Sequence, residues 1–335
     1  MLRAGVIGVG WVATNRHIPS LINDDRVKII AVASTSVSAE TVAKRFGIPQ
    51  SYNSVDELLK QSLDIVNICT PPFTHHELVV RAAEAGCHIL VEKPFAMSSA
   101  EAEAMVDVAR RNNVKLCVSH NFLFSRSMTR ARMLRDSDAL GRVTGAIAFQ
   151  MTNLKRRLPK WYPLLPGGLF FDESPHMLYS ILEFLGDVSV VWADTEKWES
   201  NRQPFSRVEA LMQSKDATAY LRFTFNAPKD EWILAIIGTK RVLLLDLFRD
   251  VIVELDEGGQ HTPFEVLVDS LGFIWRTTKE TAKSGFRFLI KRLYYGHDEL
   301  IRRFIDSVEN DTQPPVPAEE GKKVIALMEQ ILHRD

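Results

Sequence analysis

Two segments far apart in the sequence carry charged side chains whose types suit acid–base chemistry. In the first, Glu92-Lys93-Pro94 directly follows the apolar run 87–91, which predicts a short buried strand after Gly86. Pro94 forces a turn immediately after the lysine, so the ammonium group of Lys93 is aimed in one direction. Such a group can stabilise negative charge that develops on an oxygen atom. Taken alone, the tripeptide would more often be a solvated ion pair that ends a strand.

The second segment, 167–176, contains Asp172 and His176 four residues apart. We expect a helical turn from Ser174, with Pro175 at its first position, so that the two side chains lie on one helical face. A carboxylate beside an imidazole sets the tautomer of the ring and keeps its pKa near neutrality, as proton exchange with an alcohol requires. The alternative is a carboxylate that caps the helix and an unrelated surface histidine.

The N-terminal residues carry a glycine pattern that is typical of dinucleotide binding. Residues 4–13 predict a strand, a glycine turn and the start of a helix. Glycine at position 8 allows the tight turn, glycine at position 10 lets the backbone approach a pyrophosphate, and alanine at position 13 allows close packing of helix on strand. The residues that we expect to contact a bound dinucleotide are Gly8, Gly10, Trp11, Val12 and Ala13.

The end of the second predicted strand should contact the adenosine ribose. Sites that prefer NAD usually have Asp or Glu there, whereas this chain has the hydroxyl run Ser34, Thr35 and Ser36. Hydroxyl groups can bind a 2′-phosphate, no acidic side chain repels it, and Lys44 and Arg45 follow on the next predicted helix. The sequence therefore favours NAD(P) binding with a preference for NADP(H).

A proline-rich loop after the third predicted strand should lie at the same edge of the sheet as Lys93. Its two consecutive prolines make it rigid. We expect Thr70, Pro71, Glu92 and Lys93 to contact the cofactor. His75 could also contact the cofactor at its nicotinamide side, although a histidine that caps the following helix is the commoner arrangement.

The order of predicted elements indicates two domains. Strands and helices alternate as far as Asn121, which predicts a parallel, doubly wound Rossmann sheet. Beyond it, predicted strands follow one another, which indicates an α+β domain with a large, mostly antiparallel, open-faced sheet. Helix 177–185 would cover one face, and the other face is apolar enough for contacts between copies. We expect an NAD(P)-binding domain at 1–121 and a substrate-binding and oligomerisation domain at 122–335.

Composition excludes several other classes of protein. The 335 residues are 46% hydrophobic and 25% charged, with a formal net charge of −1, so a disordered chain is disfavoured and nothing favours a nucleic-acid partner. No long apolar run suggests a transmembrane helix, and the opening residues lead directly into a strand, so we expect a cytoplasmic protein. Cys69, Cys87 and Cys117 lie far apart in apolar stretches, which indicates reduced core thiols, and we expect no metal site.

Taken in order along the whole chain, these motifs resemble those of the Gfo/Idh/MocA oxidoreductase family. The combination of Glu-Lys-Pro with a downstream Asp-x-x-x-His is specific to it. The resemblance implies a Rossmann domain, an open-faced C-terminal sheet, and homodimers or homotetramers built on that sheet. It also implies that Lys93 orients and polarises the reacting oxygen, and that His176 takes or returns its proton with Asp172 beside it. The family often has Asn where this chain has Pro72, which affects one minor cofactor contact.

The motifs and the resemblance together predict hydride transfer between a nicotinamide and a hydroxyl-bearing carbon. The family suggests a sugar, a polyol or a nucleotide-linked sugar as the substrate. Two alternatives stay open. One is a non-catalytic nucleotide-binding sensor, against which the presence of Lys93, Asp172 and His176 counts; the other is an NAD-dependent glycosidase of similar fold, which would retain its cofactor without net turnover.

Substrate contacts are expected from two segments. One follows the last strand of the Rossmann domain, and the other is 155–162, where four cations beside two aromatic residues could hold a phosphate or carboxylate. A solvated loop is the commoner interpretation of the second segment. The candidate substrate-binding residues are Asn121, Arg126, Lys155, Arg156 and Trp161.

The segment 276–293 has an unusual charge pattern. Between residues 276 and 292 six basic residues occur with one acid, Glu280, and four of the bases, Lys279, Lys283, Arg287 and Lys291, recur at intervals of four. On a helix this spacing makes a basic stripe beside large apolar residues, as in a helix that lies on a membrane surface. A helix that packs on its own domain with a solvated cationic face is the commoner interpretation.

Overall fold

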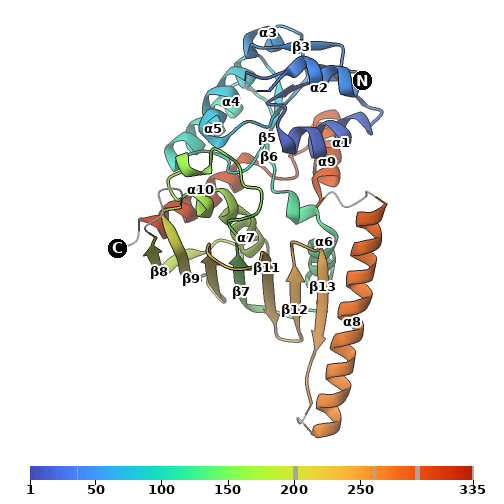
Figure 1. Cartoon of the computed structure of the whole chain (residues 1–335), viewed down its shortest axis with the longest axis vertical. Helices are drawn as coiled ribbons and strands as arrows, with labels where there is room; N and C mark the ends of the chain where they lie inside the picture. The colour runs from blue at the N-terminus through green and yellow to red at the C-terminus, as the bar shows by residue number, and fades with distance from the viewer. Residues whose placement is uncertain (36, 199–202, 260–261, 291–294, 334–335) are drawn as a thin grey trace. The chain divides into compact units, whose positions relative to one another are not determined.

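The computed structural model describes residues 1–35, 37–198, 203–259, 262–290 and 295–333, and Figure 1 shows the course of the chain. Two compact units are present. The first comprises Met1–Asn121 together with Gly296–Glu329, and the second comprises Phe122–Tyr295 together with Gln330–Asp335. Of the sequence motifs, Ser36 and residues 291–293 of the basic segment lie outside the described residues.

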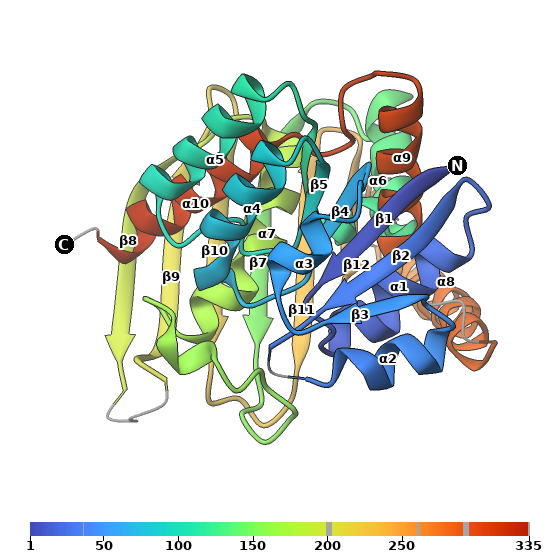
Figure 2. The same ribbon diagram turned by 90° about the horizontal axis from the view of Figure 1, so that it is seen from above.

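The first unit is built on a parallel sheet with the strand order β3-β2-β1-β4-β5-β6 (Figure 2). Apart from the edge strand β3, its strands are mostly apolar and buried, as expected for a sheet covered by helices on both faces. The prediction of a doubly wound Rossmann sheet is confirmed. The strands are β1 (Leu2–Ile7), β2 (Val27–Ala33), β3 (Gln50–Tyr52), β4 (Ile65–Ile68), β5 (His88–Val91) and β6 (Leu116–Val118).

Two of the crossover helices of this unit, α2 and α5, begin at capping side chains that the sequence supplies. The hydroxyl of Ser38 accepts a hydrogen bond from the backbone of Thr41, and the hydroxyl of Ser98 accepts one from the backbone of Glu101. Gly47 ends its helix in the left-handed conformation. The segments are η1 (Ala13–His17, a π-helical turn), α1 (Ile18–Ile22), α2 (Ala39–Phe46), α3 (Val55–Leu59), η2 (Pro72–Thr74), α4 (His75–Glu84) and α5 (Ser99–Arg111).

Two C-terminal helices, α9 (His297–Glu309) and most of α10 (Ala318–Leu332), complete the first unit. The guanidinium of Arg26 forms ion pairs with Asp306 and Glu309 of α9. In the connection between α9 and α10, the carbonyl of Val316 accepts a hydrogen bond of 3.1 Å from the backbone N–H of Val118 in β6. The expected second domain, 122–335, therefore does not include residues 296–329, because these contacts tie the segment to the Rossmann sheet.

The second unit is built on a mixed sheet with the order β13-β12-β11-β7-β10-β9-β8. All neighbouring pairs are antiparallel except β7 and β10. This confirms the predicted large, mostly antiparallel sheet. The strands are β7 (Val143–Met151), β8 (Ser189–Lys197), β9 (Phe205–Gln213), β10 (Thr218–Thr224), β11 (Glu231–Gly238), β12 (Arg241–Asp246) and β13 (Val251–Asp256). Its helical segments are η3 (Asn121–Phe124), α6 (Arg126–Asp136), η4 (Tyr162–Leu164), α7 (Leu169–Leu185) and α8 (Pro263–Leu289).

The two faces of this sheet differ in what covers them. Helix α7 packs on β7 and β10, and the ring of Phe170 contacts that of Phe223 edge-on at 5.4 Å. Residues that point to the opposite face leave apolar side chains exposed, among them Ile147, Trp192 and Leu211. The strand register places these three residues on the same face of the sheet.

Helix α8 is the longest helix, with 27 residues, and begins at a capping box formed by Thr262 and Glu265. It packs against β13 at the edge of the sheet (Figure 1). Nowhere in the described part of the chain does a helix combine the length and apolar character needed to cross a membrane.

Candidate active site

The glycine turn after β1 has the geometry that a dinucleotide-binding turn requires. Gly8 has a φ of +84°, and a Cβ atom there would lie 2.7 Å from a methyl carbon of Thr70. At Gly10, by contrast, a Cβ would meet no heavy atom within 4 Å, so this backbone is open to an approaching phosphate. Ala13 is fully buried at the start of η1, and Trp11 beside it is 49% exposed. These residues fit a bound dinucleotide.

The two glycines predict different defects when each is replaced by alanine. Gly8→Ala should lower the free energy of unfolding by about 1–3 kcal/mol, because of its positive φ and the contact with Thr70. Gly10→Ala should keep native stability but lose affinity for the dinucleotide by about tenfold or more, because its methyl group would occupy the phosphate's approach. Thermal unfolding and titration of cofactor against tryptophan fluorescence measure the two effects, and equal affinity in Gly10→Ala would contradict the assignment.

The hydroxyl run after β2 is partly engaged in its own turn. The hydroxyl of Ser34 accepts a hydrogen bond from the backbone N–H of Val37 at 3.2 Å, and Ser34 is buried. Thr35 is exposed. Lys44 forms an ion pair with Glu40 at 2.6 Å on the surface of α2. Of the described hydroxyl groups in this run, that of Thr35 is therefore the more accessible to a ribose or a 2′-phosphate.

The loop after β4 is joined to the turn after β5 by His75. Its ring is fully buried between two backbone carbonyls, that of Thr70 at 2.9 Å from Nε2 and that of Pro94 at 2.9 Å from Nδ1. Burial lowers the pKa of the imidazole. His75 thus joins the two segments, Thr70-Pro71 and Lys93-Pro94, that we expect to contact the cofactor. Lys93 itself is partly exposed at the end of β5.

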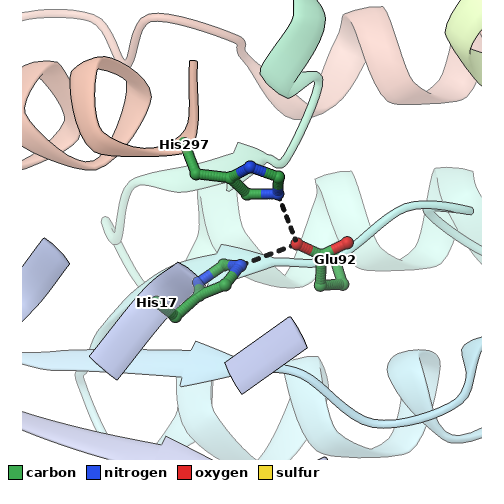
Figure 3. A group of neighbouring side chains, drawn as sticks. All are labelled: His17, Glu92 and His297. Carbon is green, nitrogen blue, oxygen red and sulfur yellow. Dashed lines mark hydrogen bonds and ion pairs between the residues drawn. The ribbon is translucent and has the colours of Figure 1, made fainter. Parts of the chain in front are cut away.

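Behind Lys93 lies a buried cluster that the sequence did not reveal: His17, Glu92 and His297 (Figure 3). The Nε2 atom of His17 lies 2.7 Å from a carboxylate oxygen of Glu92, and Nε2 of His297 lies 3.9 Å from the same oxygen. On the far side of the His17 ring, the amide of Asn67 lies 3.2 Å from Nδ1. The carboxylate of Glu92 is therefore occupied by contacts with His17 and His297, whereas the adjacent Lys93 is partly exposed.

His17 and Glu92 form a buried pair of opposite charges. Burial by itself would lower the pKa of His17, but the adjacent Cys69 sulfur and Glu92 carboxylate raise it above its ordinary value. Burial would likewise raise the pKa of Glu92, yet hydrogen bonding and the charge of His17 lower it to about 2. Burial also raises the pKa of the Cys69 thiol, in keeping with a reduced core cysteine.

This pair predicts a dependence of stability on pH. The contribution of His17 to the free energy of unfolding is complete below its unfolded pKa of 6.5, and it is lost as pH rises through the raised pKa of the folded state. The contribution of Glu92 is complete above its unfolded pKa of 4.5, and it is lost as pH falls toward its folded pKa of about 2. His17→Gln should therefore cost about 3 kcal/mol near pH 6, and less at pH 9. Thermal unfolding of both proteins from pH 5.5 to 9.5 tests this. A difference that is constant with pH would mean that His17 is neutral throughout.

The same three side chains are the ones, among the described residues, that could jointly hold a metal ion, since their ligand atoms lie within 4.8 Å of one another. Two imidazoles and a carboxylate are ligands for zinc or iron. However, the 2.7 Å contact between His17 and Glu92 has the length of a charge-assisted hydrogen bond, with a proton between the two atoms. The geometry therefore favours a hydrogen-bonded pair over a metal site.

In the second unit, Asp172 and His176 lie on one continuous helix, α7. The expected helix start at Ser174 is wrong: α7 begins at Leu169, and Pro175 is inside it. A proline in a helix interior removes one backbone hydrogen bond. The burial of nearly every side chain along Leu169–Ile181, whether apolar or polar, offsets that loss. His176 is 7% exposed and Asp172 is 6% exposed.

The nearest polar partner of the His176 ring is Tyr179, one helical turn further on. The Nδ1 atom of His176 lies 2.7 Å from the hydroxyl oxygen of Tyr179, which also accepts a hydrogen bond from the backbone N–H of Phe122 at 3.2 Å. The rings of Phe122 and Trp232 lie 4.7 and 5.2 Å from the His176 ring. Tyr179 thus orients the imidazole through its Nδ1 atom. The spacing of three residues could have identified it from sequence.

Asp172 is close to Arg156 of the candidate substrate segment. Burial lowers the pKa of Arg156, and the charges of Asp230 and Asp172 oppose that change. Arg156 also forms ion pairs with the buried Glu173 and with Asp230. This side chain therefore anchors the segment 155–162 on α7, which limits its freedom to bind a substrate.

The remaining substrate candidates differ in their surroundings. Arg126 forms an ion pair with Glu280 of α8 at 2.7 Å, so its charge is already compensated. Lys155 is exposed, and Trp161 is partly buried. Asn121 is 4% exposed at the end of the first unit. Of these four residues, Lys155 has the most accessible side chain.

Comparison with known proteins relates both units to one family. Residues 2–120 match the family model described as "Oxidoreductase family, NAD-binding Rossmann fold", and residues 128–244 match the GFO/IDH/MocA C-terminal domain. The glycine turn, Lys93 and His75 all lie within the first match. Asp172, His176 and Tyr179 lie within the second.

Relatives and solved structures are also similar to this chain. D-glucoside 3-dehydrogenase of Escherichia coli is 30% identical over 194 residues, which cover 55% of this chain and only 54% of that protein. Myo-inositol 2-dehydrogenase of Thermotoga maritima is 23% identical over 339 residues, or 97% of this chain and 94% of that protein. The WlbA dehydrogenase from Bordetella pertussis, solved with NADH and UDP-GlcNAcA, has a TM-score of 0.82 at 19% identity and covers 98% of this chain and 94% of that one.

Proposed function

Because the chain belongs to the Gfo/Idh/MocA family of NAD-binding oxidoreductases, we propose that it transfers a hydride between a nicotinamide dinucleotide and a hydroxyl-bearing carbon of a sugar, polyol or sugar derivative. One observation carries this proposal. Lys93 is the second residue after β5, and β5 lies two strands away from β1, whose end leads into the glycine turn. In a parallel sheet both ends lie at the same edge, where α/β folds bind their ligands.

Each candidate residue has a distinct role in this proposal. The Gly8–Gly10 turn and the Thr70-Pro71 loop would hold the dinucleotide, which supplies the hydride acceptor or donor when bound. The ammonium of Lys93 would stabilise negative charge on the substrate oxygen. His176 would exchange the proton of that oxygen, while Tyr179 holds its Nδ1 atom at 2.7 Å. The aromatic rings around His176 would limit access of water to this proton.

The names of the relatives support the substrate class. Two of them are a D-glucoside 3-dehydrogenase and a myo-inositol 2-dehydrogenase, and a solved relative binds UDP-GlcNAcA. All three molecules carry secondary hydroxyl groups on a six-membered ring. We infer that this chain acts on a ring hydroxyl of a similar molecule.

Absorbance at 340 nm tests the proposed activity. The purified protein would be mixed with NAD⁺ or NADP⁺ and a panel of pyranosides, inositols and nucleotide sugars. Formation of reduced cofactor by the wild type but not by Lys93→Ala supports the proposal. Cleavage of a glycoside without net formation of reduced cofactor would instead identify a glycosidase, and cofactor binding without any turnover of the panel would favour a sensor.

We also propose that the enzyme prefers NADP(H), because Thr35 and its neighbours offer hydroxyl groups where an acidic residue would repel the 2′-phosphate. Thr35→Asp should raise the KM for NADP⁺ by about tenfold or more through charge repulsion, while the KM for NAD⁺ should change by less than about threefold. Steady-state kinetics with both cofactors measure this. A wild-type preference for NAD⁺, or an equal effect of the substitution on both cofactors, would contradict the assignment.

The proposed enzyme would assemble as a homodimer or homotetramer through the exposed face of the second unit's sheet. Ile147, Trp192 and Leu211 are between 37% and 45% exposed there, which is a large apolar exposure for a free sheet face. Light scattering on the purified protein measures its mass directly.

A further inference from the structure

Helix α8 attaches to its own domain through polar side chains. Arg276 donates to the backbone carbonyl of Glu254 and pairs with Asp256 at 2.7 Å. Glu280 pairs with Arg126, and the hydroxyl of Ser284 donates to the backbone carbonyl of Arg249. Residues 276, 280 and 284 are four apart and share one helical face. The face of α8 that meets the domain is thus a line of hydrogen bonds and ion pairs.

The opposite face of α8 is apolar and faces solvent. Its side chains follow the spacing of a continuous helical stripe, and seven of them are more than half exposed, among them Phe264 at 74%, Leu271 at 58%, Ile274 at 59%, Trp275 at 68% and Leu289 at 77%. Leu267 and Phe286 extend the stripe at 54% and 63%. A surface helix of a globular protein normally turns its apolar stripe toward the core. In α8 the polarity is reversed, which contradicts the sequence-based expectation of a helix that packs with its apolar residues inward.

Basic side chains border the apolar stripe along the second half of the helix. Lys279, Lys283 and Arg287 lie four residues apart on its flank. After Glu280, which already pairs with Arg126, no acidic residue follows within α8. The nearby acids Glu254 and Asp256 on β13 are paired with Arg130 and with Arg241 and Arg276. Lys283 pairs with Glu280 at 2.6 Å, whereas among the described residues no acidic side chain pairs with Lys279 or Arg287, so these two carry uncompensated positive charge.

We propose that α8 lies flat on an anionic lipid bilayer, with its apolar stripe inserted at the level of the acyl-chain boundary and its basic flank among the head groups. A stripe of Phe, Leu, Ile and Trp beside lysine and arginine is the composition of such interfacial helices. At 1.5 Å per residue the 27 residues provide a contact about 40 Å long. The helix lies on the membrane and does not cross it.

A second copy of the chain fits this surface less well than a bilayer does. In a symmetric contact between two α8 helices the same patch would face itself. In a parallel contact Lys279, Lys283 and Arg287 of both copies would come together, and in an antiparallel contact they would meet only Glu265, which is engaged in the capping box, and Asp269. Anionic head groups, in contrast, complement the basic flank, and each basic residue near such a surface contributes about 1 kcal/mol.

Co-flotation with vesicles tests the proposal on the full-length protein. The wild type should float with vesicles of phosphatidylcholine containing 30% phosphatidylglycerol at low salt, and less with phosphatidylcholine alone. Leu271→Glu/Ile274→Glu should reduce the bound fraction by about tenfold or more, since each apolar side chain withdrawn from the bilayer costs about a factor of ten. Lys279→Glu/Arg287→Glu should weaken binding to anionic vesicles and abolish its dependence on salt.

Met133→Glu is the matched control, because Met133 is an apolar residue of α6 that is 57% exposed outside α8. This variant should float like the wild type. Circular dichroism and cofactor binding establish that each variant is folded, independently of any substrate. Failure of the wild type to float with anionic vesicles at low salt overturns the proposal. So does conversion of a larger oligomer to a smaller one by Leu271→Glu/Ile274→Glu without vesicle binding by the wild type, which would assign the stripe to a second copy.

Discussion

Replacing Lys93 by alanine is expected to lower kcat by about a hundredfold to a thousandfold, with a change of less than about threefold in the dissociation constant of the cofactor. The reason is that the ammonium group interacts more strongly with the charge that develops on the reacting oxygen than with the ground state. The backbone of the turn after β5 would remain, since His75 and Pro94 still connect it to the neighbouring loop. Steady-state kinetics and a cofactor titration separate the two quantities.

Lys115→Ala provides the matched control for the lysine. Lys115 belongs to the same unit and pairs with Asp311 at 2.8 Å, away from the ends of the strands that carry the candidate site. Its replacement should leave kcat within about twofold, because an exposed ion pair contributes little. Near-native turnover of Lys93→Ala would contradict the role of Lys93, whereas equal losses in both lysine variants would indicate a general effect of charge.

Replacing His176 by glutamine is expected to lower kcat by about 10²–10⁴-fold, the usual contribution of a positioned acid–base group. Glutamine keeps a polar side chain of similar reach but cannot exchange the proton. In the dependence of kcat/KM on pH, the limb that reports protonation of the imidazole should disappear in this variant. Measurement of the rate from pH 5 to 10 with saturating cofactor would show it. If the limb persists, another group accepts the proton.

Tyr179→Phe distinguishes orientation of the ring from the proton transfer itself. It removes the hydroxyl 2.7 Å from Nδ1 of His176 but retains the aromatic ring. We expect kcat to fall by about tenfold and the limb in the dependence of kcat/KM on pH to shift, because the imidazole of His176 loses a partner that fixes its tautomer. Loss of folded protein without a displaced limb would assign Tyr179 a purely structural role.

The first unit was predictable from the sequence because its signals are local. The glycine pattern, the apolar strands and the alternation of strands with helices each depend on residues within one βα segment. The same holds for the position of Lys93 at the end of β5. In the second unit, the repeated strands predicted a mostly antiparallel sheet, but the start of α7 was misplaced, because Pro175 suggested a helix start and tertiary burial overrode it.

Contacts between distant residues explain what could not be predicted. His17 and His297 approach the same carboxylate oxygen of Glu92 although 280 residues separate them in the sequence. No local pattern contains that information. The outward orientation of the apolar stripe on α8 is a similar case, since periodicity gives the relative positions of side chains on a helix but not the direction in which each face points.

The return of residues 296–329 to the first unit has a consequence for biosynthesis. A ribosome releases Met1–Asn121 long before it has made α9, yet Arg26 finds its partners Asp306 and Glu309, and Glu92 finds His297, only on that last segment. The first unit can therefore complete its core, and the buried carboxylate of Glu92 can gain all its partners, only after nearly the entire polypeptide has emerged. Truncation at the C-terminus would harm the beginning of this protein more than its middle.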